Sequence, residues 1–126
     1  MKRVIAAILL LSAAATLSVV TGRIFRAELN TLLSSLDELV DTAQTDSYDE
    51  LTEKTQAVLL QWESSSGILH SLVMHEGMDD VEENITALPL LLEHSDRDEF
   101  RNKCIEAINQ IKNLLDAEEL RLENIL

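Results

Sequence analysis

The pattern of apolar and polar residues divides the chain into an uncharged N-terminal run and a series of amphipathic segments. Beyond Met1, Lys2 and Arg3, the residues from Val4 to Gly22 carry no charge. As a helix this run would be roughly 28 Å long, close to the roughly 30 Å hydrocarbon core of a bilayer. A core helix of this length in a soluble protein usually keeps a polar face. The run therefore predicts a membrane-spanning helix.

The first amphipathic segment continues this run without a break in the helical pattern. Its apolar residues follow at steps of four and three, the period of a helix that packs on other helices. They are Phe25, Leu29, Leu32, Leu36, Leu39 and Ala43. The pattern predicts one long helix, whose first half spans the membrane and whose second half belongs to the domain core.

A second helix is predicted to begin at Ser47, because Ser47 and Glu50 have the spacing of a capping box. Residues 64–67 are poor helix formers and predict a kink or a soft turn. Gly77 is expected to end this helix in the left-handed conformation. Its apolar stripe consists of Tyr48, Leu51, Thr55, Val58, Trp62, Leu69, Leu72 and Val73.

Two further helices are predicted from similar signals. Asp79 opens the third, with a stripe at Val81, Ile85, Leu88 and Leu92, a bend at Pro89 and an end at His94-Ser95. Asp96 and Glu99 open the fourth, which we expect to be the longest after the first. Its stripe consists of Phe100, Cys104, Ile108, Ile111, Leu115, Leu122 and Ile125.

The predicted fold class is all-α, because no segment alternates apolar and polar residues for long enough to form a strand. We expect an N-terminal transmembrane helix that continues into a small antiparallel helical bundle of about four helices. The corresponding division is a transmembrane anchor or signal segment at residues 1–22 and a helical domain at residues 23–126.

An uncleaved anchor and a cleaved secretory signal share a basic start and an apolar run. Residues 13–15 form one candidate cleavage site, and residues 20–22 form a second. Apolar residues continue past Ala15 to Val20, which favours the anchor. Basic residues flank both ends of the run with only a small bias. We expect the short N-terminal tail inside the cell and the domain outside the membrane.

The charge of the domain limits its partners. Beyond Gly22 it carries eight Lys and Arg against 23 Asp and Glu, a formal charge of −15. Such a surface repels nucleic acid and tolerates basic proteins or divalent cations. Cys104 is the single cysteine, so no internal disulfide forms, and its place on an apolar stripe predicts a buried thiol.

The best candidates for chemistry lie between the second and third helices. His75 and Asp79 are four residues apart, and Asp80 follows, which makes these three the candidates for metal ligands. No recognised zinc or phosphate-binding motif and no nucleophile turn is present. We expect no catalytic residue, no cofactor and no enzymatic activity.

Trp62 allows two interpretations. A tryptophan on an apolar stripe is most often part of the core. The alternative is a residue at the centre of a contact with another protein. On this alternative Trp62 and His75 are the candidate partner-binding residues.

The chain resembles an uncharacterised bacterial family, the domain-of-unknown-function family 4363. The resemblance rests on the basic start and apolar span, Asp46-Ser47-Tyr48, Trp62, His75 with Asp79 and Glu82, and the ending Leu122-Glu123-Asn124-Ile125-Leu126. The chain departs from it at Ser64–Gly67 and at Pro89, where stronger helix formers are expected. The resemblance implies a small membrane-anchored protein and no activity.

These observations predict a single-pass protein of the cell envelope, anchored through residues 4–22. Its acidic domain is expected to act through protein contacts, as an interaction scaffold or accessory subunit. The sequence also leaves self-association as an alternative, because the amphipathic pattern from Phe25 suits pairing with a second copy of the chain. The alternative function is an extracytoplasmic sensory bundle that binds a small ligand or a divalent metal.

Overall fold

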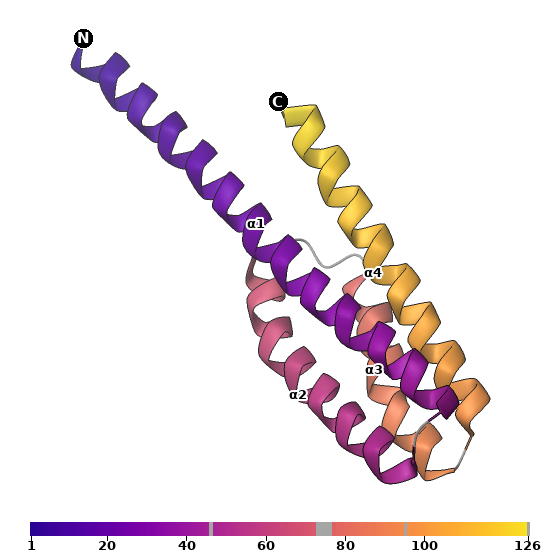
Figure 1. Ribbon diagram of the computed structural model, residues 1–126. Coiled ribbons are helices and arrows are strands. Elements are labelled where there is room, and N and C mark those ends of the chain that lie inside the picture. The colour runs from indigo at the N-terminus through magenta and orange to yellow at the C-terminus, as the bar shows by residue number, and fades with distance from the viewer. Residues whose placement is uncertain (46, 73–76, 95, 126) are drawn as a thin grey trace.

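All regular structure in the described part of the chain is helical. The computed structural model describes residues 1–45, 47–72, 77–94 and 96–125. Within these ranges it contains four helices: α1 (Lys2–Thr45), α2 (Tyr48–Leu72), α3 (Met78–Glu93) and α4 (Arg97–Ile125). The prediction of an all-α fold is confirmed, and within the described residues α4 is the longest helix after α1, as expected (Figure 1).

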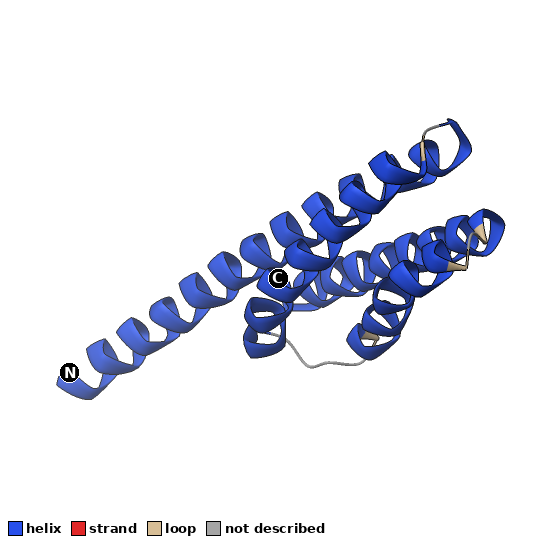
Figure 2. Cartoon of the chain, turned by 90° about the horizontal axis from the view of Figure 1, so that it is seen from below, coloured by secondary structure: helices blue, strands red, loops and turns tan. Residues whose placement is uncertain are grey.

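The four helices form an up-and-down bundle. Helix α1 packs on α2 and α4, and α3 packs on the same two neighbours from the opposite side. Figure 2 shows the bundle from below, with the N-terminal half of α1 extending away from it. The end of α4 leaves the bundle on the same side as this half of α1 (Figure 1). The structure thus confirms a long N-terminal helix that continues into a bundle.

The core consists mainly of the stripes that the sequence predicts. All six stripe residues of α1 are buried, from Phe25 to Ala43. The four stripe residues of α3 are buried as well. From the other two helices the core receives Leu51, Thr55, Val58, Trp62, Leu69, Phe100, Cys104, Ile108 and Ile111. Burial of this apolar surface, at roughly 25 cal/mol per Å², is the main force that holds the bundle together.

Two of the predicted N-terminal caps are present. The amide of Glu50 donates to Ser47 Oγ at 3.3 Å, and α2 begins at the following residue, Tyr48. The amide of Glu99 donates to Asp96 Oδ1 at 3.1 Å in the same way. Each bond satisfies an amide that has no partner within its own helix.

The third helix begins two residues earlier than the predicted cap at Asp79 implies. Gly77, with φ 95°, lies directly before α3, and Asp79 is in the first turn instead of at the cap. Helix α2 is described only as far as Leu72. Gly77 therefore takes the expected left-handed conformation, but at the start of α3. Helix α3 continues through Pro89, and His94 caps its end as predicted, while Ser95 lies outside the described residues.

Two expectations about α2 need correction. The helix is continuous through residues 64–67, so a turn does not form there, while a kink within the continuous helix stays a prediction. Ser65 fills the stripe between Trp62 and Leu69 and is 3% exposed, so packing compensates for the low helix propensity of this segment. Tyr48 is 43% exposed although it shares the spacing of the stripe, because it is the first residue of α2 and lies at the edge of the bundle.

Candidate functional site

The exposed apolar half of α1 is the most distinctive surface of the protein. Among the described residues, one helix, α1, is long and apolar enough to cross a membrane, with a mean hydropathy of 2.4 in its most apolar window. None of that window is buried within the structure. The large apolar residues on all sides of the helix are exposed, among them Ile8, Leu10, Leu11 and Leu17. A buried core helix is therefore excluded, whereas a signal anchor and a signal sequence both fit.

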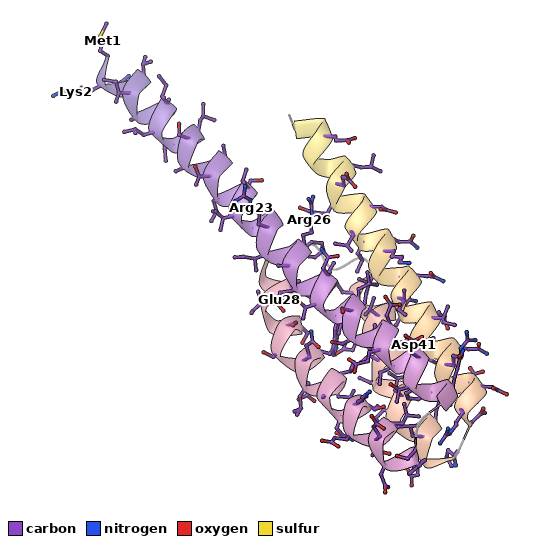
Figure 3. All side chains as sticks on the ribbon, in the orientation of Figure 1. Met1, Lys2, Arg23, Arg26, Glu28 and Asp41 are labelled. Atoms are coloured by element: carbon purple, nitrogen blue, oxygen red, sulfur yellow. The ribbon has the colours of Figure 1, made fainter. Side chains whose placement is uncertain are left out.

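Basic residues mark both ends of this apolar surface. Figure 3 shows Lys2 at the free end of α1 and Arg23 and Arg26 where the helix enters the bundle. Both arginines are exposed. Long basic side chains at such positions can reach the headgroups of a bilayer while their stems remain against the helix.

The exposed half of α1 joins the bundle without a linker. Gly22 is the first buried residue of the helix, and Phe25, the first residue of the core stripe, is 2% exposed. The α-helix is continuous across this junction. Any force that orients the apolar half in a membrane is therefore transmitted directly to the bundle.

A small groove lies between α1 and α2 on the side of the bundle. It has a cavity volume of about 90 Å³ and is lined by Ser35, Glu38, Lys54, Ala57, Val58 and Gln61. Ser35 donates to Gln61 Oε1 at 2.9 Å, which joins the two helices.

Lys54 lines this groove and pairs with carboxylates on both helices. Its Nζ lies 3.2 Å from Glu38 Oε1 and 3.5 Å from Glu50 Oε1, and it also donates to Thr42 Oγ1 at 3.2 Å. The hydrogen bond with Glu38 raises the pKa of Lys54 above its usual value, with smaller contributions from the nearby charges. The ammonium group therefore remains charged and holds the two helices together at this point.

Polar side chains also join the helices inside the bundle. Ser65 Oγ on α2 donates to Glu28 Oε2 on α1 at 2.5 Å. Asn84 Nδ2 on α3 donates to Gln110 Oε1 on α4 at 2.8 Å, and Asn84 is 5% exposed. Such bonds favour one pairing of the helices, because another register would leave buried polar groups without partners. The stripe pattern did not predict these residues, since it assigns core positions to apolar side chains.

Trp62 is a core residue in this structure. Its side chain is 1% exposed and belongs to the same apolar cluster as Leu32 and Leu36. The alternative of a surface residue that contacts another protein requires an exposed indole, and this arrangement of helices does not present one. His75, the other candidate for partner binding, lies outside the described residues.

The metal candidates are not brought together by the described structure. Asp79 and Asp80 are exposed in the first turn of α3. There their negative charge stabilises the positive end of the helix dipole. Within the described residues, no group of three or more His, Cys, Asp or Glu is arranged to hold a metal ion.

Cys104 is a buried thiol, as the stripe predicts. It is 0% exposed, and burial raises the pKa of its thiol to about 12. Desolvation disfavours the thiolate, which is the nucleophilic form. This cysteine thus acts as a small apolar residue of the core.

The fold and the exposed half of α1 define the class of protein, a four-helix bundle whose first helix carries a candidate membrane span. The family model DUF4363, a domain of unknown function, matches residues 19–125. The chain belongs to this family, which confirms the resemblance that the sequence indicated. No curated protein matches the chain, and no solved structure matches it.

Proposed function

We propose that the protein is anchored by a single span in the cell membrane and that its acidic bundle binds another protein outside the membrane. It acts there as an interaction scaffold or accessory subunit and not as an enzyme. The observation that carries the proposal is the continuity of α1, which is an exposed apolar helix before Gly22 and a core helix after Phe25.

The junction supports an uncleaved anchor over a secretory signal. Cleavage after Gly22 would leave Arg23 as the first residue of α1, two residues before the core residue Phe25. The new ammonium group and the arginine would both lie at the positive end of the helix dipole, which is unfavourable. An intact span avoids the new ammonium group, and it keeps the α-helix continuous up to the core residue Phe25.

The surface charge supports binding to a protein with a basic face. The exposed faces of the bundle hold most of the acidic residues of the chain, and the domain has a formal charge of −15. The apolar residues of the described stripes are largely occupied within the core. Contacts are therefore expected to be polar and charged, and to weaken as salt screens them.

Membrane extraction and mass measurement test the anchor. The full-length protein, with a C-terminal tag, is expressed in cells, and its membranes are washed at alkaline pH. We expect the protein to stay in the membrane fraction with an intact mass of 14.1 kDa plus the tag. A soluble product that lacks the first 15 or 22 residues would show that the segment is a cleaved signal.

Protease accessibility tests the orientation. In cells stripped of their wall but with an intact cytoplasmic membrane, added protease is expected to digest the C-terminal tag while a cytoplasmic control protein survives. A tag that is cut only after the membrane is broken would place the bundle in the cytoplasm. Affinity capture from native membranes at low and high salt then tests for a basic partner, whose recovery should fall as salt rises.

Ligand binding is a second candidate, because the groove between α1 and α2 brings a hydroxyl, an amide and the Lys54 ammonium close together. Titration calorimetry of the full-length protein with zinc and calcium would examine the metal version, in which His75, Asp79 and Asp80 are the ligands. An absence of heat would exclude metal binding by these residues. For a small polar molecule in the groove, Lys54→Met should abolish binding, and circular dichroism of the variant checks that the bundle remains folded.

A further inference from the structure

The end of α4 lies at the level where the apolar half of α1 ends. The side chains of Gln44 on α1 and Arg101 on α4 lie within hydrogen-bond distance, at 2.8 and 3.2 Å when the Gln44 amide oxygen faces Arg101, which indicates the register of the two antiparallel helices. From Arg101 to Ile125 is about 36 Å of helix, and from Gln44 back to Val20 is also about 36 Å. In Figure 1 the two helix ends accordingly point to the same side of the bundle.

Helix α2 reaches the same level. Ser65 on α2 is bonded to Glu28 on α1, and Gln61 is bonded to Ser35. Counting from these bonds at about 1.5 Å per residue, the end of α2 at Leu72 lies level with residues 21–24 of α1. The bundle therefore has a membrane-proximal end, formed by the last turns of α2 and α4 and by residues 23–26 of α1.

Large apolar side chains are exposed on three helices at this membrane-proximal end. They are Ile24 on α1, 41% exposed, Ile68 on α2, 42% exposed, and Leu120 on α4, 61% exposed. By the registers above, each lies within about 10 Å of Gly22 along the bundle axis. Exposed charges accompany them: Arg23 on α1, and Glu119 and Glu123 on α4.

We propose that this membrane-proximal end lies in the headgroup layer of the membrane that α1 crosses, so that the bundle stands directly on the lipid surface. The inference rests on the proposed anchor. The headgroup layer is roughly 5 to 8 Å thick on each side of the hydrocarbon core. Because no linker separates the span from the bundle, residues level with Gly22 cannot be held away from this layer.

The chemistry of this end suits a zwitterionic lipid surface. Apolar side chains such as Leu120 lose contact with water when they enter the interfacial region. Arg23 matches the lipid phosphate, and the carboxylates of Glu119 and Glu123 match the ammonium group of choline or ethanolamine. Contact at three helices, together with the span, would set the tilt of the bundle and leave its opposite end free for a partner.

Tryptophan quenching in vesicles tests the inference. The full-length protein is reconstituted in phosphatidylcholine vesicles in which part of the lipid carries a nitroxide on its headgroup. Leu120→Trp places a reporter on α4 at the proposed contact. Leu60→Trp is the matched control, since Leu60 is 66% exposed and lies roughly 18 Å from the level of Gly22. The native Trp62 is buried and supplies a constant background.

A third variant separates the inference from the anchor. Ile24→Trp is adjacent to the span, so the nitroxide quenches it whenever α1 is inserted in the bilayer. We expect strong quenching for Ile24→Trp and Leu120→Trp, and emission close to that of the wild type for Leu60→Trp. If Ile24→Trp is quenched and Leu120→Trp is not, the contact of α4 with the headgroups is overturned and the anchor still holds. If neither variant is quenched, the contact and the anchor are both overturned.

A second reporter guards against local disturbance of α4. Ile68→Trp on α2 tests the same contact from a different helix, and circular dichroism shows whether each variant keeps its helix content. If Leu120→Trp loses helicity, Ile68→Trp decides the result. Quenching of Leu60→Trp as strongly as of Ile68→Trp would also contradict an upright bundle, because it would indicate that the side of the bundle lies on the membrane.

Discussion

Replacing Leu36 by Ala tests the packing at the centre of the bundle. Leu36 is 0% exposed and lies on the half of α1 that is held between α2 and α4. The substitution removes three buried carbon groups, Cγ and the two methyls. At about 0.8 kcal/mol for each group, the free energy of burial that is lost is about 2.4 kcal/mol. The cavity adds to this loss, because neighbours on two packed helices relax only in part. We expect unfolding to become easier by about 3 to 5 kcal/mol.

The assay is urea denaturation of the full-length protein in detergent micelles, followed by the fluorescence of Trp62. This residue is the single tryptophan of the chain and is buried in the same apolar cluster as Leu36, so its emission reports the loss of the core. The dependence of the unfolding free energy on urea should stay unchanged while the midpoint falls. Since domains are stable by only about 5 to 15 kcal/mol, the change should be large.

The matched control is Leu60→Ala, which makes the same chemical change at an exposed position. Leu60 is 66% exposed, and surface substitutions usually change stability by about 0.5 kcal/mol or less. A loss for Leu36→Ala that is no greater than the loss for Leu60→Ala would refute the assignment of the α1 stripe to the core. It would also remove the basis for the shared helix of span and bundle.

Three further changes test individual features by the same urea assay. Burial raises the pKa of the Cys104 thiol from 9.0 to about 12, so between these values the folded state keeps the proton that the unfolded state loses. The contribution of this thiol to the free energy of unfolding should therefore be constant below pH 9.0 and fall as the pH rises toward 12. Cys104→Ala should lack that fall, and a decline equal to that of the wild type would assign it to other groups. Asp96→Ala removes the acceptor of the Glu99 amide and should cost about 1 kcal/mol, and an unchanged midpoint would show that the cap is not formed. Gly77→Ala should cost about 1 to 2 kcal/mol, since φ is 95° and the new Cβ would lie 3.0 Å from Leu114 Cδ2; a stable variant would argue against the left-handed conformation.

Local signals in the sequence predicted the helices well. The burial of the stripe from Phe25 to Ala43 follows from the spacing of its apolar residues, which is typical of a helix packed on other helices. The starts of α2 and α4 follow from Ser47 and Asp96, whose side chains bond an amide three residues later. Burial of Cys104 follows from its place on a stripe.

The polar contacts of the bundle were not predictable in this way. Ser65 can be buried because Glu28 on another helix accepts a hydrogen bond from its hydroxyl, and no pattern within α2 reveals that neighbour. For the same reason the continuation of α2 through residues 64–67 was missed: helix propensity is a sum of small local terms, and packing outweighs it. Glu118 is 5% exposed on α4 although glutamate is seldom buried, and the apolar stripe does not single it out.

For the candidate site, the sequence by itself determined the apolar run, its flanking basic residues and the acidity of the domain, because these depend on residue type alone. Tertiary structure decided which residues share a level along the bundle. Ile24, Ile68 and Leu120 are far apart in the chain, and the pairing of α1 with α2 and α4 brings them to the same end. Bonds such as Ser65 to Glu28 favour that pairing, because they form only when the two helices meet in one register.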